Sequence, residues 1–404
     1  MTPETLAFLH SAAGQALMAS LSPDDLEPAN ELRLITRLRR TIDPSSAGAA
    51  IALGRVRLRA VGKFGTDAAR LYLTTSALEQ ASDGPVRRYR ASLFQPGSRV
   101  LEVCCSIGSD GLALAAAGVH VLGIELDAVR AACARLNAAA LGLSERMQVV
   151  QADARQLPAA FTGWDGAFYD PARRGADGKR IFDVEGYEPP LSLCLGWDVP
   201  RVLVKLAPGV AIESLSGYRG RVEFISADGD LKEALLMHER DALTPAGAHL
   251  VAVLLHNGHA LRWEREPGTA PPPPVTGQPR AWLSEPDAAL IRAGLVSDAA
   301  LAWGGVQVDE SIAYITSDTP PDTPWARSFR VRETIPFNVK HLRALLREHE
   351  IGHVTIKKRG TAVTPDVLLP QLKLKGTKSA TVILTRCEGR QVALVCDDPV
   401  PGKA

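Results

Sequence analysis

Between residues 98 and 245 the chain alternates short apolar runs with alanine-rich helical stretches. The apolar runs have the length of strands, and the longer stretches between them have the length of helices. Strand, helix and strand repeated in this way are typical of a parallel sheet covered by helices on both faces. Such a sheet binds its ligands at the carboxyl ends of its strands. The expected strands are 99–103, 120–124, 147–151, 166–169, 202–205 and 222–225, with the clearest helices at 111–117 and 128–141.

Helical periodicity dominates the first 95 residues. Leu32, Ile35 and Leu38 recur at three-residue spacing, which places them on one face of a helix, and Asp43-Pro44 is expected to end that helix. Four arginines surround these apolar positions: Arg33, Arg37, Arg39 and Arg40. They form either a solvated helix face packed beside its neighbour or a basic surface for RNA.

The last third of the chain begins with a proline-rich stretch. Residues 267–279 contain four consecutive prolines and are expected to form a linker or an exposed loop. A small α+β module of ferredoxin-like arrangement should follow, with strands at 329–333, 353–358, 380–384 and 391–395 and helices at 339–349 and 365–372. The expected domains are 1–95 (helical), 96–265 (the α/β sheet), 266–327 (linker and connecting region) and 328–404 (α+β).

Charge is uneven along this chain of 404 residues. The formal net charge of +1 argues against a whole-molecule electrostatic grip on nucleic acid. Residues 331–404, however, hold 13 lysines and arginines against 7 aspartates and glutamates, a local net charge of +6. Two clusters stand out, Lys357-Lys358-Arg359 and the group Lys373, Lys375 and Lys378. They are either solvated surface charge or a contact for RNA phosphates, whose affinity would fall with salt.

Cysteine usage and the N-terminus bear on the compartment. The six cysteines are scattered without a C-x-x-C pair or a nearby histidine, so we expect reduced thiols and no metal site. The first residues lack the basic and apolar regions of a signal peptide, and no apolar run approaches ~20 residues. A cytoplasmic protein without a membrane segment is the expectation.

The first strand of the sheet runs into a series of small residues that leads into a helix. Residues 100–111 read Val-Leu-Glu-Val-Cys-Cys-Ser-Ile-Gly-Ser-Asp-Gly. Small residues let the backbone approach a ligand closely, and the start of a helix favours a negatively charged group such as a carboxylate. The candidate cofactor residues in this run are Glu102, Cys104, Ser106, Gly108 and Asp110.

Acidic residues also mark the ends of the next two strands. Glu125 lies about 20 residues past the turn, where a carboxylate can bind two ribose hydroxyls. Asp153 follows the third strand and can accept a hydrogen bond from an adenine amino group. Carboxylates at three successive strand ends suit a nucleoside that carries an amino acid, so we expect S-adenosylmethionine (SAM) as the cofactor. A Rossmann dehydrogenase shares some of these features, but its G-x-G-x-x-G fingerprint is absent.

The expected reacting site is Asp170-Pro171-Ala172-Arg173, at the end of the fourth strand. Amino-methyltransferases resemble it in placing an acidic or amide residue before prolines at this strand end. The Asp170 side chain and the Pro171 carbonyl would then hold a target amine so that its lone pair faces the methyl carbon. Arg173 stands where that pattern usually has an aromatic residue, and an arginine can stack on a base or bind a phosphate. Asp170 is a candidate cofactor ligand as well.

Two readings stay open around this site. An Asp-Pro turn that closes a strand can be purely structural, although its place downstream of a SAM-like turn favours a role in the reaction. Lys205, at the end of the fifth strand, either contacts substrate or extends its ammonium group to water at the rim of the sheet.

Taken together, these segments resemble the bacterial class I SAM-dependent methyltransferases that carry a C-terminal THUMP-like domain. The resemblance runs nearly end to end, with Ser106 and Ser109 standing where the family usually has glycine. The matching segments are 78–82, 89–91, 100–110, 170–174, 204–209, 229–234, 285–287, 291–295 and 356–360.

The resemblance implies SAM binding and a methyl transfer to a nucleobase in structured RNA such as tRNA or rRNA, because THUMP domains of other enzymes bind RNA. Two alternatives are a methyltransferase that acts on a protein or small molecule, and a non-catalytic RNA-binding protein with a methyltransferase fold. The intact acidic residues Glu102, Glu125, Asp153 and Asp170 argue against the non-catalytic alternative.

Overall fold

The computed structural model describes residues 1–157, 163–173, 179 and 181–401. The chain divides into two compact units. The first comprises residues 1–221 and 233–247, and the second comprises residues 222–232 and 248–404. Each unit is described by itself below.

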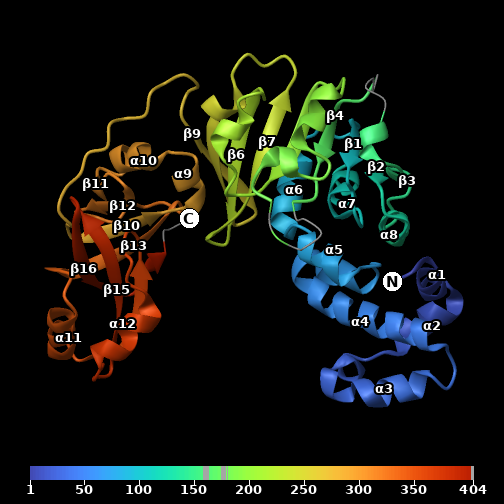
Figure 1. The fold of residues 1–404 in the computed structure, drawn as a ribbon, viewed down its shortest axis with the longest axis horizontal. Coiled ribbons are helices and arrows are strands. Elements are labelled where there is room, and N and C mark those ends of the chain that lie inside the picture. The colour runs from blue at the N-terminus through green and yellow to red at the C-terminus, as the bar shows by residue number, and fades with distance from the viewer. Residues whose placement is uncertain (158–162, 174–178, 180, 402–404) are drawn as a thin grey trace. The chain divides into compact units, whose positions relative to one another are not determined.

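A mixed sheet forms the centre of the first unit, with strand order β3-β2-β1-β4-β5-β7 (Figure 1). Strands β1 to β5 are parallel, and β7 pairs antiparallel with β5. Burial at nearly every position of β1, β4 and β5 is typical of parallel strands covered on both faces. The strands are β1 (Arg99–Val103), β2 (His120–Glu125), β3 (Met147–Gln151), β4 (Gly166–Tyr169), β5 (Arg201–Leu206) and β7 (Asp230–Glu239).

Five of the six expected strands are confirmed to within one residue, as β1 to β5, and the sixth, 222–225, lies inside β6 (Gly220–Ala227). The helices α7 (Ser109–Ala116) and α8 (Ala128–Ala140) lie where periodicity placed them. The exception is β7, which the pattern analysis did not predict. Its first half is half-exposed and charged, so the apolar run that identifies a buried strand begins only at Ala234.

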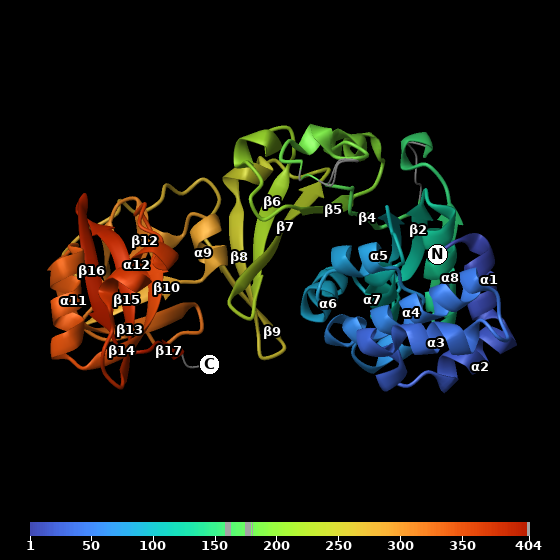
Figure 2. The ribbon, with the colours of Figure 1, turned by 60° about the horizontal axis from the view of Figure 1, so that its bottom comes forward.

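The N-terminal region is helical, as expected, but one helix face was predicted wrongly. In α3, Leu34 and Leu38 are buried, whereas Leu32 is 80% exposed. Asp43-Pro44 begins a helix instead of ending one, because the Asp43 carboxylate accepts from the amides of Ser45 and Ser46. The helices are α1 (Pro3–His10), α2 (Ala12–Ser20), α3 (Glu31–Leu38), α4 (Pro44–Phe64), α5 (Thr75–Gln80) and α6 (Gly84–Ser92); α1 lies beside α8 (Figure 2).

The second unit contains two groups of strands. In the first, β8 (Leu250–His256) pairs parallel with β6 (Gly220–Ala227) and antiparallel with β9 (His259–Glu264). The second is a sheet of order β11-β12-β10-β13-β16-β15-β14, in which β17 (Val400–Pro401) also pairs with β13. Its strands are β10 (Trp282–Pro286), β11 (Val306–Asp309), β12 (Ile312–Ser317), β13 (Ala326–Pro336), β14 (Ile351–Lys358), β15 (Lys378–Cys387) and β16 (Arg390–Cys396).

The C-terminal elements follow the predicted order, with α11 (Val339–Glu348) and α12 (Pro365–Leu372) in the expected places. Their connection differs from a ferredoxin-like arrangement, in which two helices alternate with strands in the order β-α-β-β-α-β. Here α12 joins β14 to β15, and these two strands are parallel. The elements expected from the sequence already run in this order, with the second helix between the second and third strands, so a ferredoxin-like arrangement did not follow from them.

The region expected to connect the sheet domain to the α+β module contributes strands of its own. The proline-rich stretch 267–279 has neither a helix nor a strand, apart from an isolated bridge at Thr276. Strand β10, however, pairs with β13 over five residues and with β12 on its other side. The domain boundary placed at residue 327 stays a prediction, but the sheet continues across it.

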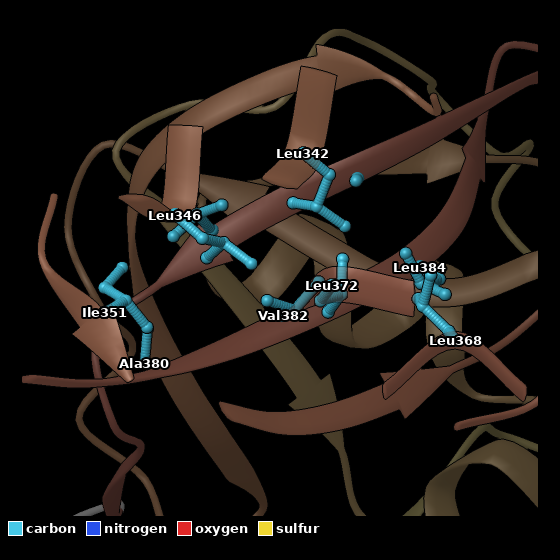
Figure 3. Packing of buried hydrophobic residues seen from close by; sticks show 10 residues of the cluster. Leu342, Leu346, Ile351, Leu368, Leu372, Ala380, Val382 and Leu384 are labelled. Carbon is cyan, nitrogen blue, oxygen red and sulfur yellow. The ribbon is translucent and has the colours of Figure 1, made fainter. Parts of the chain in front are cut away.

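Alternating residues of β15 face two separate cores. Val382 and Leu384 pack with Leu342 and Leu346 of α11 and with Leu368 of α12 (Figure 3). Ile383, between them, points to the opposite face, which it shares with residues of β10, β12 and β13. This two-residue period is that of a strand buried on both sides.

Among the described residues, no helix combines the length and apolarity needed to span a membrane.

Candidate functional site

The turn after β1 adopts a backbone conformation that side chains normally avoid. Cys104 (φ 63°), Ser106 (φ 52°) and Gly108 (φ 79°) all have positive φ. Left-handed conformations of non-glycine residues cost on the order of 1–3 kcal/mol and cluster at ligand sites. Ser106 stands where the family usually has glycine, and the turn keeps the glycine-type backbone there. Ser109 is the other position where the family usually has glycine. It lies in the first turn of α7, where the backbone does not require a positive φ.

Side-chain hydrogen bonds hold this turn in place. The buried Glu125 carboxylate accepts from the amide of Ser106 at 2.8 Å and from that of Asp127 at 2.9 Å. Asn137 of α8, which is fully buried, donates to the carbonyl of Ile107 at 3.0 Å and also bonds both backbone groups of Tyr72. The strand end of β2 and the helix α8 therefore compensate for the strain in the turn.

Glu102, on β1 just before the turn, carries a buried carboxylate. Its Oε1 accepts from the amide of Gly111 at 2.9 Å, while its Oε2 is buried without a partner among the described residues. Burial raises the pKa of Glu102 well above its usual value, and Asp110 adds to the effect. A Cβ at Gly111 would lie 2.2 Å from Oε2, so a larger residue there would displace the Glu102 carboxylate. Ser106 Oγ is likewise buried and unpaired, which leaves two polar atoms available to a ligand.

Asp110 takes part in a buried ion-pair network. Arg90 of α6 binds Asp110 through Nε at 3.0 Å and through Nη2, and it binds both carboxylate oxygens of Glu233 on β7. All three side chains are less than a tenth exposed. Burial acts to raise the pKa of Asp110, but Arg90, followed by Lys205, more than offsets it, so that this pKa lies below its usual value. The network connects α6, α7 and β7.

Asp153, which is predicted to bind the adenine amino group, forms an ion pair with a neighbouring residue. Its carboxylate binds the guanidinium of Arg155 at 2.8 to 3.1 Å and also accepts from the Arg155 amide at 3.0 Å. Hydrogen bonds from the Arg155 side chain and backbone lower the pKa of Asp153. In the sequence, only the spacing of two residues from a strand-end carboxylate points to Arg155 as a partner of Asp153.

Asp170 lies directly beside the turn. Its amide donates to the carbonyl of Val103, the last residue of β1, at 3.2 Å. Its carboxylate Oδ2 accepts from Lys205 Nζ at 2.8 Å. The segment that follows is fixed as well, because Ala172 exchanges two backbone hydrogen bonds with Glu188.

The rest of the predicted reacting site is positioned by the same segment. Pro171 is buried, Arg173 is half-buried, and the carbonyl of Arg173 accepts from the amide of Ile181 at 2.9 Å. Arg174, part of the matched segment, lies outside the described residues. Within the part of the chain that the structure describes, no group of three or more histidine, cysteine or carboxylate side chains could hold a metal ion.

The structure thus brings Glu102, Cys104, Ser106, Gly108 and Glu125 together at one edge of the sheet, with Asp153 and Asp170 just after the two strands, β3 and β4, that flank β2 and β1. Their contacts with cofactor or substrate stay predictions. Asp110 lies in the same segment, but the contacts of its carboxylate are those of a buried ion pair.

Comparison with known proteins identifies the same parts of the chain. Residues 100–169 match a methyltransferase domain, residues 326–398 a THUMP domain-like family, and residues 2–60 a domain of unknown function. An uncharacterized S-adenosylmethionine-dependent methyltransferase of Mycobacterium tuberculosis is 34% identical over 343 residues, which cover 82% of this chain and 90% of that protein. This protein belongs to that family of class I SAM-dependent methyltransferases with a THUMP-like domain.

Two further likenesses concern the fold and a shorter segment. A crystal structure from Porphyromonas gingivalis W83, assigned as a methyltransferase, superposes with a TM-score of 0.76 at 22% identity and covers 98% of both chains. A 23S rRNA (uracil(1939)-C(5))-methyltransferase of Acidithiobacillus ferrooxidans is 38% identical over 137 residues, which are 34% of this chain and 27% of that enzyme. The first supports the fold, and the second covers only part of either protein.

Replacing Arg90 with alanine tests the buried network. The change leaves the carboxylates of Asp110 and Glu233 buried without their cation, so we expect the free energy of unfolding to fall by about 3–5 kcal/mol. Urea denaturation of the variant and the parent protein measures this. Arg88→Ala, at an exposed position on the same helix, is the control and should change the free energy by less than about 0.5 kcal/mol. Equal effects of the two substitutions would contradict the assignment.

The raised pKa of Glu102 makes a pH-dependent prediction. Because burial raises this pKa in the folded state, the stability that Glu102 contributes is full below its usual value of 4.5 and is lost as the pH rises through the folded pKa. We expect Glu102→Gln to gain stability relative to the parent between about pH 4 and about pH 8, measured by urea denaturation. Glu145→Gln, at an exposed position, should show no such trend. A constant difference between Glu102→Gln and the parent across this range would contradict the prediction.

Proposed function

We propose that this enzyme transfers the methyl group of SAM to a nucleobase in structured RNA. One observation carries the proposal: Asp170 borders the turn after β1, with its amide bonded to the carbonyl of Val103 at 3.2 Å. The residue expected to orient the acceptor therefore adjoins the residues expected to hold the cofactor. Direct methyl transfer depends mainly on such alignment of the two reactants.

The residues around the turn fit SAM. In this proposal the strained backbone from Cys104 to Gly108 passes close to the cofactor, and the unpaired Glu102 Oε2 and Ser106 Oγ bind its polar groups. The Glu125 oxygens can each accept a further hydrogen bond from a ribose hydroxyl, and Asp153 can accept one from the adenine amino group. Asp110, whose carboxylate binds Arg90, supports the start of α7 instead of contacting the cofactor.

Asp170 has the means to hold an acceptor amine. Lys205 binds its Oδ2, and Oδ1 has no hydrogen-bond partner among the described residues, so Oδ1 can accept from an N–H group. SAM supplies an electrophilic methyl group: the nitrogen lone pair forms the new bond to carbon while the carbon–sulfur bond breaks with its electron pair on sulfur. The nitrogen then loses its proton to solvent. Arg173 follows Asp170 in the same segment, and in this proposal it stacks on the target base or binds its phosphate.

Some of the basic residues proposed to contact RNA form ion pairs with glutamates. Lys357 and Arg359 of the first cluster both bind Glu285, and Lys378 of the second binds Glu350. Their charges are therefore partly compensated. Lys358, Lys373 and Lys375 are exposed and have no ion pair within the described ranges. We propose that these three lysines contribute most of the phosphate contacts of the THUMP-like region.

The partial likeness to a uracil C5 methyltransferase favours carbon methylation as a second candidate. A pyrimidine carbon becomes nucleophilic enough for this reaction when a thiolate first adds to the ring. All cysteines except Cys104 are buried, and Cys104 lies in the turn after β1. Burial, with further contributions from Glu125 and Asp170, raises the pKa of Cys104 and keeps it a thiol near neutral pH. A nitrogen acceptor held by Asp170 therefore fits the site better.

Asp170→Ala tests the proposal. Labelled SAM is incubated with the enzyme and with either total RNA or total protein from a strain that lacks the gene. We expect label in RNA with the parent enzyme, a loss of transfer on the order of 100-fold or more with Asp170→Ala, and unchanged SAM binding by titration calorimetry. Asp241→Ala, at an exposed position, is the control and should retain full activity.

Three outcomes would contradict parts of the proposal. Label that enters only protein would exclude RNA as the substrate and favour the alternative of a protein acceptor. No transfer by the parent enzyme to any fraction would favour a non-catalytic RNA-binding protein. Equal loss of SAM binding and transfer in Asp170→Ala would mean that Asp170 binds cofactor and does not orient the acceptor.

A further inference from the structure

Lys205 lies beside Asp170 because of the sheet register. Strands β4 and β5 are parallel, and Tyr169 on β4 pairs with Val204 on β5. Asp170 and Lys205 are the next residues on the two strands, so they face each other at the carboxyl edge. A lysine at this position is thus placed next to the predicted reacting carboxylate by backbone pairing alone.

The two side chains differ in their access to the site. The Lys205 side chain is 6% exposed, whereas that of Asp170 is 26% exposed. Lys205 Nζ donates to Asp170 Oδ2 at 2.8 Å and to the carbonyl of Gln80, at the end of α5, at 3.4 Å. Its ammonium group therefore donates hydrogen bonds to a carboxylate and a carbonyl. This excludes an ammonium group that extends to water at the sheet rim, and it leaves Lys205 little surface for substrate.

We propose that Lys205 is a positioning residue for methyl transfer. It fixes one oxygen of Asp170 and thereby sets the direction in which the other oxygen accepts from the target N–H. A carboxylate bound at one oxygen has fewer orientations than a free one, and a misplacement of about 1 Å at a reacting group can cost on the order of 100-fold in rate. This inference rests on the proposed role of Asp170.

The alternative is that Lys205 has a purely structural role. Lys205 could instead hold the segment after α5 through Gln80. Lys63 provides the matched control, because its ammonium donates to the carbonyls of Leu78 and Ala81 in that same segment. Among the described contacts, Lys63 does not bind Asp170. Loss of segment anchoring should therefore appear in Lys63→Met, and loss of Asp170 positioning only in Lys205→Met.

The experiment compares Lys205→Met, Lys205→Arg and Lys63→Met in the full-length enzyme with labelled SAM and RNA from the deletion strain. We expect kcat of Lys205→Met to fall on the order of 100-fold, with the Kd for SAM and the KM for RNA unchanged within about threefold. Arginine keeps the cation and should restore kcat to within about tenfold of the parent. Lys63→Met should lower thermal stability and leave kcat within about tenfold of the parent.

A double substitution separates this inference from the proposed function. If Lys205 acts through Asp170, then Lys205→Met should reduce single-turnover transfer by no more than about threefold when Asp170 is already asparagine. Additive losses would overturn the inference, as would equal kcat losses in Lys205→Met and Lys63→Met, or full activity of Lys205→Met. The proposed function fails separately, when the parent enzyme itself transfers no label to RNA, and the proposed role of Asp170 fails when Asp170→Ala retains full activity.

Discussion

The buried ion pairs of Arg90 are the interaction on which the rest of the site depends. One guanidinium from α6 binds a carboxylate at the start of α7 and another on β7, and its carbon lies 5.1 Å from the ring centre of Phe168 on β4. Buried charges are stable only when they are paired and hydrogen-bonded, so the three side chains require one relative placement of these elements. That placement aligns the start of α7 with the end of β1, where the turn of residues 104–108 begins.

The turn itself stores strain that the surrounding fold compensates. Cys104 and Ser106 adopt conformations for which glycine is better suited, and the Glu125 carboxylate and the Asn137 amide bind the turn's backbone. Glu102 adds an unpaired buried oxygen to the same small volume. Left-handed residues and an unsatisfied carboxylate reduce the stability of the protein without ligand. Their concentration in one turn fits the proposed cofactor site, because a bound cofactor can supply the missing partners.

Much of this arrangement could be predicted from the sequence. Most of the parallel strands were recognisable because they are short buried apolar runs, and the carboxylates Glu102, Glu125 and Asp153 lie at or just after the ends of β1, β2 and β3. Less could be predicted where structure depends on distant residues. Nothing local shows that Arg90 binds Asp110 and Glu233, or that Lys205 binds Asp170, because these pairs lie between 20 and 143 residues apart. Leu32 was assigned to the buried face of α3 because three-residue spacing fits more than one helix face.

Mass spectrometry of RNA nucleosides is a direct test of the proposal that the enzyme methylates a nitrogen of an RNA base. Total RNA from a strain that lacks the gene would be compared with RNA from its parent. We expect one N-methylated nucleoside to disappear in the deletion strain and to return with the parent gene but not with a gene encoding Asp170→Ala. Identical nucleoside profiles in the deletion strain and its parent, or loss of a carbon-methylated nucleoside, would contradict it.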